Sequence, residues 1–249
     1  CSVEQLKSAV RLINKYGREK GERGLPKLLP GLNFIAGLNG ETTESYNYNK
    51  KLLSSLIDDG LQLRRINIRQ VEGEGFQKIE EKPFRQFKEW VRDEIDAPLL
   101  QEMFPTGQVL KRVYWESHNN RIRLPSNLSE EHRSSSIHGK AGVSFGRQIG
   151  AYPILIGASY LIPLESESDI VVTSHGKRSI TGVEIGLDIN SVSQAQLQAI
   201  PGIGEKTAWR IVSSRAKRMR KNRDVPAFES LEDAFEGEVP ELVFTIFNS

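Results

Sequence analysis

Cysteine is almost absent from this sequence, in which Cys1 is the only one among 249 residues. A single thiol cannot close an intrachain disulfide, and it cannot build a cysteine-rich zinc site or an iron–sulfur cluster within this chain. The histidines lack the paired spacing of metal ligands; they are His118, His132, His138 and His175. The sequence therefore predicts no metal site and no cofactor held by this chain alone.

Long apolar runs and a strong net charge are missing as well. The longest apolar stretch, residues 152–164, contains Pro153, Gly157 and Pro163, so it is too short and too broken to span a bilayer. No signal peptide opens the chain, and a cytoplasmic protein without membrane contact is expected. Because 34 Lys and Arg nearly balance 32 Asp and Glu, any basic surface must come from local clustering.

The first third of the chain predicts alternating helices and strands. Residues 3–16 repeat apolar side chains at helical spacing, and this helix starts without an initiator methionine, which indicates a processed, split or truncated product. A strand, a helix and a strand are predicted next, at residues 31–38, 42–58 and 61–71. Two strands joined by a crossover helix should be parallel, with a right-handed connection.

The middle of the chain changes from helices to short strands. A helix at residues 82–95 is expected to end before Pro98 and Pro105. Strands with Gly and Pro between them then indicate a small barrel or sandwich; they are predicted at residues 109–116, 143–149, 154–156, 170–175 and 179–183. The polar residues 121–140 predict a mobile loop, and the pattern is helical again from Leu187.

Residues 197–208 read LQAIPGIGEKTA and match a helix-hairpin-helix at each diagnostic position. Gly202 and Gly204 permit a tight turn and leave the backbone bare, so main-chain N–H groups at the start of the second helix can approach a phosphate oxygen. Lys206 and Thr207 stand in the first turn of that helix and can add an ammonium and a hydroxyl. The motif predicts binding to a nucleic-acid backbone and leaves the choice of DNA or RNA open.

The second helix of the hairpin continues into a basic run, which is an electrostatic footprint for a polyanion. The predicted backbone contacts in this run are Arg210, Arg215, Lys217 and Arg218, and the run continues with Arg220, Lys221 and Arg223. The alternative is a hairpin that serves only packing or protein contact, with the cations as a solvated face. A packing role would not need the basic run, so binding is the favoured interpretation.

These patterns predict an α+β chain with three domains. The first, residues 1–105, is a partial αβαβ lobe with a linking helix, and the family resemblance described next implies that this lobe is a partial parallel (βα) barrel. The second, residues 106–185, is a small antiparallel β-barrel. The third, residues 186–249, is the helix-hairpin-helix domain.

Two further blocks carry a family resemblance. LPGLNFIAGLNGET at residues 29–42 is similar to the glycine-rich turn after the fifth strand of a radical SAM barrel, and LRRINIRQV at residues 63–71 resembles the sixth strand. The whole chain resembles the C-terminal portion of an archaeal-type radical SAM family, with a TRAM-like domain and a helix-hairpin-helix after the barrel. The resemblance implies S-adenosylmethionine and a 4Fe-4S cluster for the complete enzyme. The residues it places at the cofactor edge are Gly37, Gly40, Glu41 and Asn67.

The cluster-binding motif of that family, Cys-x-x-x-Cys-x-x-Cys, is not present in this sequence. The chain is therefore expected to be the distal part of such an enzyme, completed by a missing N-terminal segment or a separate chain, or else a remnant that kept binding alone. Without the family, Gly37 and Gly40 would be an ordinary turn between a strand and a helix. No catalytic residue is predicted.

The β segment resembles a TRAM domain, a small OB-like barrel that holds RNA in tRNA-modifying enzymes. Its expected nucleic-acid contacts are Arg112 and Arg147, with Tyr114, Trp115 and Phe145 as stacking rings or as core. The function expected for the chain is the nucleic-acid-binding part of a radical SAM nucleic-acid-modifying enzyme, holding substrate and one edge of the S-adenosylmethionine site. The alternative is a stand-alone, non-catalytic adaptor that binds DNA or RNA.

The segment from Gly142 to Gly146 spells G-x-S-x-G, the motif of serine hydrolases, with Ser144 at its centre. Asp169 and His175 follow in the chain order of a catalytic triad. A nucleophile elbow needs a strand that turns sharply into a helix, whereas the pattern after Ser144 is β-like. The sequence therefore predicts no hydrolase site here.

Overall fold

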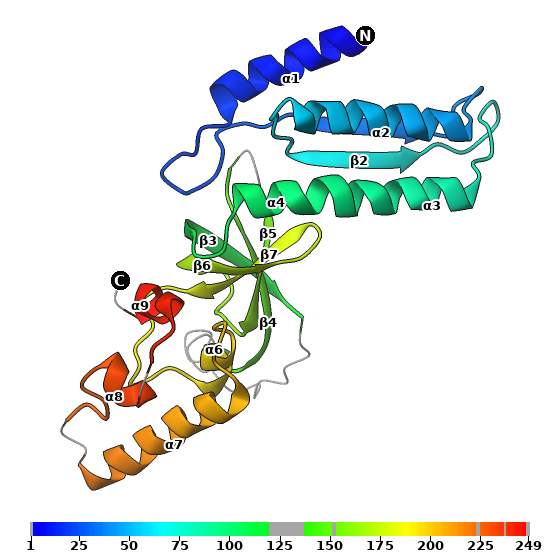
Figure 1. The fold of residues 1–249 in the computed structure, drawn as a ribbon. Coiled ribbons are helices and arrows are strands. Elements are labelled where there is room, and N and C mark those ends of the chain that lie inside the picture. Colours follow the sequence, from blue (N-terminus) through cyan, green and yellow to red (C-terminus); the bar gives the residue numbers. More distant parts are fainter. Residues whose placement is uncertain (1, 120–136, 151–152, 223–224, 237, 248–249) are drawn as a thin grey trace. The chain divides into compact units, whose positions relative to one another are not determined.

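Figure 1 shows the computed structural model of the chain, which describes residues 2–119, 137–150, 153–222, 225–236 and 238–247. The chain forms two compact units. The first unit consists of Cys1–Phe104 together with Gly150–Pro153 and His175–Arg178. The second unit consists of Pro105–Ile149, Ile154–Ser174 and Ser179–Ser249. The barrel and the hairpin therefore belong to the same unit.

The first unit is built on a β-α-β arrangement. Strand β1 (Gly31–Ala36), helix α2 (Thr43–Asp58) and strand β2 (Arg65–Gln70) follow one another, and β1 pairs with β2 in parallel, from Gly31 opposite Arg65 to Ala36 opposite Gln70. The predicted parallel pair is confirmed. Helix α1 (Val3–Gly17) precedes it. The buried Asn14 of α1 accepts a hydrogen bond from the N–H of Gln62 and donates to the Gln62 carbonyl, which fixes α1 to the turn before β2.

The helix after β2 is longer than predicted. Helix α3 (Glu81–Trp90) continues through a π-helical turn, Val91–Asp96, into α4 (Ala97–Met103). The expectation that Pro98 ends the helix is wrong, because the wide turn changes the hydrogen-bonding pattern just before it. The N–H of Ala97 bonds to the carbonyl of Arg92, and Pro98 then stands in the first turn of α4, where a missing N–H costs little.

The core of the first unit lies between the strands and these helices, which run alongside them (Figure 1). Phe87 of α3 meets Phe34 of β1 edge to face, with ring centres 5.8 Å apart, and Tyr46 of α2 at 5.4 Å. Leu53 and Leu56 of α2 are fully buried. The aromatic contacts fix α2 and α3 against β1, and so position the turn that follows β1.

The second unit contains a closed five-stranded barrel. Its strands are β3 (Val109–His118), β4 (Ala141–Gln148), β5 (Leu155–Tyr160), β6 (Glu167–His175) and β7 (Ser179–Glu184), in the spatial order β3-β4-β5-β7-β6. The predicted small barrel is confirmed, but it is not wholly antiparallel, since β5 and β7 pair in parallel. An odd number of strands cannot alternate direction around a closed ring. One parallel pair is therefore unavoidable.

The barrel core is centred on large buried rings. Trp115 is fully buried, and its indole N–H donates to the hydroxyl of Ser168 at 2.8 Å. On the paired strand, a Cβ at Gly146 would lie 2.6 Å from the Tyr114 carbonyl oxygen and 2.9 Å from the Trp115 ring. Gly146 is therefore needed because the Trp115 ring occupies the place of a side chain. The mobile loop predicted at residues 121–140 lies mostly outside the described residues.

His138 and Glu184 form an ion pair in the second unit. The imidazole Nε2 of His138 lies 2.7 Å from a carboxylate oxygen of Glu184, whose side chain is only 9% exposed. The Glu184 N–H donates to the hydroxyl of the buried Tyr160, and the burial raises the pKa of that phenol. Hydrogen bonding to Glu184 raises the pKa of His138 above its ordinary value of 6.5. The pair links the segment before β4 to the end of β7.

We expect this pair to make the stability of the chain depend on pH. Because the folded-state pKa of His138 is raised, its contribution is fully present below the unfolded pKa of about 6.5 and is lost as the pH rises through the raised value. The imidazole is partly exposed, so the loss should be about 1 kcal/mol or less. Urea unfolding at several pH values should give a flatter profile for His138→Gln than for the parent chain. Identical slopes would contradict the assignment.

The rest of the second unit is helical. Helices α6 (Gln194–Gln198), α7 (Glu205–Lys221), α8 (Leu231–Phe235) and α9 (Glu241–Phe247) follow the barrel. Their shared core includes Leu197, Ile211 and Val243, all fully buried. The carbonyl of Ile246 accepts from the N–H groups of Gly186 and Leu187, which joins α9 to the segment after β7. No helix in the described part of the chain is long and apolar enough to cross a membrane.

Candidate nucleic-acid interface

The predicted hairpin consists of α6, a turn and α7. A capping box starts α6: the Ser193 hydroxyl accepts from the Gln196 N–H, while the Gln196 side chain accepts from the Ser193 N–H. Ile200 and Ile203 are buried at the turn, and the N–H of Ile203 donates to the Ile200 carbonyl. Gly202, between them in the chain, has a φ of +87°, which favours glycine. The two buried isoleucines thus hold one side of the turn, and Gly202 allows the backbone conformation that the turn requires.

The first turn of α7 is left open to a ligand. Gly204 is the N-cap residue, with extended backbone and no side chain to cap the helix. The first helical bond in this turn runs from the N–H of Ala208 to the Gly204 carbonyl. Within the described residues, the N–H groups of Glu205, Lys206 and Thr207 therefore have no protein acceptor. These amides, at the positive end of a 17-residue helix, can bind an anion.

A shallow groove of about 570 Å³ lies beside this turn. One wall is the segment from Gln198 to Gly204, and the other is formed by strands β5, β6 and β7. The strands contribute hydroxyl groups, from Ser159, Thr173, Ser174 and Thr181. A Cβ at Gly204 would meet nothing within 4 Å, and at Gly202 it would meet only the ring of Pro240, at 3.7 Å. The bare side of the turn is therefore accessible to a ligand's backbone.

Arg215 of the predicted basic run is a structural residue. Its guanidinium Nη1 donates to the carbonyl of Val192 at 2.7 Å and to that of Ile189 at 3.1 Å. Burial lowers the pKa of this guanidinium, with Asp188 opposing the shift. The prediction that Arg215 lies on an open phosphate-binding face is therefore wrong. Its hydrogen bonds hold the middle of α7 against the segment that precedes α6.

Two more arginines of the run have partners in the fold. Arg210 pairs with Glu236 at 2.6 Å and donates to the Phe235 carbonyl. Arg218 pairs with Asp233 at 2.6 Å and stacks on the Phe228 ring, with its guanidinium carbon 4.9 Å from the ring centre. The assumption that packing would not need the basic run is thus incorrect for these residues. They attach α7 to α8, and a phosphate would have to compete with their carboxylates.

The remaining cations of α7 are exposed. In the part of the chain that the structure describes, these side chains form no ion pair or hydrogen bond; they are Lys206, Lys217, Arg220 and Lys221. Arg223 lies outside the described residues. Trp209, which is 62% exposed on the same helix, was not among the predicted contacts. The available signal was a tryptophan between Lys206 and Arg210 in a helix rich in cations.

The two cations predicted on the barrel are also paired. Arg112 has a φ of +57°, its backbone N–H donates to Asp169, and its side chain pairs with Glu167 at 2.8 Å. Arg147 pairs with Glu116 at 2.7 Å. Both side chains remain at the surface, 60% and 42% exposed. Of the predicted stacking rings, Trp115 belongs to the core, while Tyr114 and Phe145 are half-buried.

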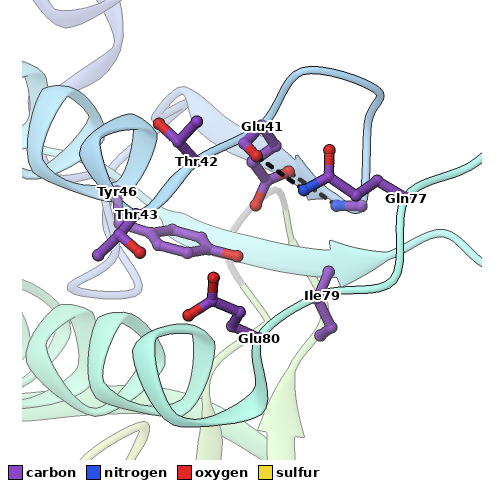
Figure 2. Close-up of a pocket in the computed structure, with 8 residues that line it drawn as sticks. Glu41, Thr42, Thr43, Tyr46, Gln77, Ile79 and Glu80 are labelled. Carbon is purple, nitrogen blue, oxygen red and sulfur yellow. Dashed lines mark hydrogen bonds between the residues drawn. The ribbon is translucent and has the colours of Figure 1, made fainter.

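The glycine turn after β1 is closed by the chain itself (Figure 2). Gly37, with a φ of +97°, donates its N–H to the Glu41 carboxylate at 2.7 Å. A Cβ at Gly37 would lie 2.7 Å from the Val71 carbonyl oxygen, so the room that glycine provides is filled by backbone rather than by a ligand. Gln77 closes the turn: its side chain donates to the Glu41 carbonyl and accepts from the N–H of Gly40.

The cavity beside this turn is small. Glu41, Thr42, Thr43 and Tyr46 line it together with Gly37, Gln77, Ile79 and Glu80, and its volume is about 20 Å³. That is room for about one water molecule. Burial raises the pKa of the Tyr46 phenol, and the neighbouring Glu41 carboxylate adds to the shift. Asn67, the fourth predicted cofactor residue, is not in this lining; its amide donates to Asn33 on the paired strand at 2.9 Å.

The G-x-S-x-G segment lies within strand β4 and does not turn into a helix. Ser144 is in the middle of β4 and fully buried, and its hydroxyl accepts a hydrogen bond from the N–H of Ile162 at 2.8 Å. The two residues that would complete a catalytic triad have other contacts: Asp169 accepts from the N–H of Arg112, and the His175 imidazole contacts the Phe104 carbonyl. Ser144 therefore supports the barrel and does not form a nucleophile elbow.

No family model matches the chain, so the radical SAM and TRAM resemblances remain predictions. A protein of Archaeoglobus fulgidus described as "Uncharacterized protein" is 36% identical over 212 residues, which cover 81% of this chain and 36% of that protein. A protein of Methanocaldococcus jannaschii, also described as uncharacterized, is 35% identical over 190 residues, which cover 72% of this chain and 31% of that protein. The chain spans about a third of the length of the curated relatives it matches.

Proposed function

We propose that the second unit of this chain binds nucleic acid, and that the hairpin turn contacts the phosphate backbone without reading base sequence. The observation that carries this proposal is the uncapped first turn of α7. Free N–H groups, the bare Gly202 and Gly204 backbone and the ammonium of Lys206 stand together beside an open groove. Helix N-termini of this kind favour phosphate oxygens. The exposed cations further along α7 add a sequence-independent attraction.

The barrel supports the same proposal through its topology. The order β3-β4-β5-β7-β6, with one parallel pair, fits a TRAM-like or OB-like barrel, a class of fold that binds oligonucleotides. Arg112 and Arg147 stay proposed contacts of the barrel. Since a phosphate at either guanidinium must compete with Glu167 or Glu116, the hairpin provides the main contact in this proposal.

We further propose that this nucleic-acid-binding unit serves a radical SAM enzyme that modifies nucleic acid. The parallel β1 and β2 pair and the glycine turn at the carboxyl end of β1 support this, because ligand sites of α/β folds lie at that edge. The described residues beside Gly37 do not fit S-adenosylmethionine by themselves, and the chain cannot hold the cluster alone. The cavity beside Gly37 has room for about one water molecule, and the single Cys1 cannot hold a cluster.

The small cavity beside Gly37 and the single cysteine favour a second candidate function, a stand-alone adaptor that binds nucleic acid without catalysis. Among the described residues, no group of His, Cys, Asp or Glu gathers in a way that could hold a metal ion. The adaptor and the enzyme part share the hairpin as their binding element. A binding experiment on the hairpin therefore tests what both functions require.

Lys206→Glu is expected to weaken binding about tenfold on every base sequence, because it removes one phosphate contact and adds repulsion beside the free amides. The dependence of log K on log salt should fall by about 1 unit. Fluorescence anisotropy on unrelated oligonucleotides at several salt concentrations measures both effects. The matched control is Lys82→Glu, which makes the same charge change at an exposed position in the first turn of α3 in the first unit. Equal effects of the two variants would contradict a specific role of the hairpin.

A further inference from the structure

Trp209 is more exposed than the other tryptophans of the chain, Trp90 and Trp115. Its relative exposure is 62%, whereas Trp115 is fully buried. It lies one turn into α7, four residues after the start of the helix at Glu205. Within the described residues, its ring has no aromatic or cationic partner. An indole left in water is a contact surface for a flat or apolar partner.

The side chains next to Trp209 on the helix indicate the chemical class of that partner. Side chains three, four and seven or eight positions apart share one face of a helix. The positions next to Trp209 on this face are Glu205 and Lys206 before it and Val212, Ser213 and Ala216 after it, and the ring stays exposed among them. The cationic positions of the face are Lys206, Lys217 and Arg220, which are exposed and free of described partners. We call this set, with Trp209, the α7 face.

The length of the α7 face matches a short stretch of a nucleic-acid strand. From Lys206 to Arg220 the helix rises roughly 21 Å at 1.5 Å per residue. Along the axis of a duplex, the phosphates of one strand recur about every 3.4 Å, so this length corresponds to roughly six nucleotides of a duplex. Trp209 stands about 4.5 Å along the axis from Lys206, about one nucleotide step from the first cation. A base beside a phosphate held at Lys206 would therefore be within reach of the ring.

We propose that Trp209 stacks on an unpaired nucleobase of the nucleic acid whose backbone the hairpin turn holds. This inference rests on the proposed function and adds a substrate class to it: strands with a base outside a duplex, such as a bulge or a loop. Val212 and the exposed Met219 give one side of the ring an apolar border, whereas the three exposed cations of the α7 face favour a polyanion over a protein partner. Every base has a flat face, so stacking needs no particular base sequence.

The test uses the full chain and three probes: a paired duplex, the same duplex with one bulged adenine, and that duplex with an abasic site in place of the bulged base. Trp209→Ala should lower affinity for the bulged probe by about 5- to 100-fold. It should leave affinity for the paired and abasic probes within about twofold, and leave the salt slope unchanged on all three. Trp209→Phe should recover part of the loss. The control for removal of an exposed ring is Tyr48→Ala, since Tyr48 is 63% exposed in the first unit.

The outcomes separate this inference from the function on which it rests. If the parent chain binds all three probes and Trp209→Ala binds the bulged probe as the parent does, stacking is excluded while backbone binding by the hairpin stands. The α7 face would then be a protein-contact surface. If the parent chain binds none of the probes at low salt, the proposed function fails, and the stacking proposal fails with it. An equal loss on all three probes would also overturn stacking, because it would show a general effect on the hairpin.

Discussion

Gly202→Val is expected to reduce binding of nucleic acid by about 100-fold or more, the largest loss from any single substitution in the hairpin. Gly202 has a φ of +87°, a conformation in which a β-branched residue is strained. The new side chain would also stand on the bare side of the turn, where a phosphate must approach the free amides of α7. Strain and steric blocking therefore act in the same direction.

Gly186→Val separates the two causes. Gly186 has a φ of +81° in the same unit, and a Cβ there would meet nothing within 4 Å, so valine adds similar backbone strain outside the hairpin. This control should keep its affinity, whereas Gly202→Val should lose it at every salt concentration. Circular dichroism and thermal unfolding establish that both variants are folded. Unchanged affinity in a folded Gly202→Val chain would identify the hairpin as a packing element and contradict the proposed function.

Arg215→Ala is expected to lower the free energy of unfolding by about 2 kcal/mol. One guanidinium nitrogen serves the carbonyls of Ile189 and Val192, and alanine would leave both without that donor in a half-buried position. Because Arg215 is occupied in this way, the salt dependence of nucleic-acid binding should not change under conditions in which the variant is folded. Urea unfolding and anisotropy on the same samples measure the two effects.

Arg220→Ala should behave in the opposite way. Arg220 is exposed and has no partner in the described part of the chain, so the change in stability should stay below about 0.5 kcal/mol. The salt slope of binding should fall by about 1 unit, because one phosphate contact is lost. The pair of variants thus distinguishes an arginine that holds the fold from one that binds. A loss of stability with Arg220→Ala as large as that with Arg215→Ala would contradict this division.

Local patterns were sufficient for the elements that carry the candidate site. The two glycines of the hairpin, the flanking isoleucines and the helix that starts at Glu205 follow from short-range rules, because a tight turn needs glycine and an apolar pair to close it. The parallel pairing of β1 with β2 follows from the helix between them. The exposed Trp209 was overlooked, although its spacing from Lys206 and Arg220 is visible in the sequence.

The sequence by itself determined the α+β class, the β-α-β arrangement and the hairpin turn, since each depends on residues that are near one another in the chain. Only the tertiary structure decided which cations are available. Arg218 pairs with Asp233 of α8, Arg210 pairs with Glu236 just after α8, and Arg215 donates to carbonyls that precede α6. The sequence shows where cations cluster. The carboxylates and carbonyls that pair with them lie on distant segments, which burial of the apolar core brings close. For the same reason, the glycine turn after β1 is closed by Val71 and Gln77, which lie more than thirty residues further along the chain.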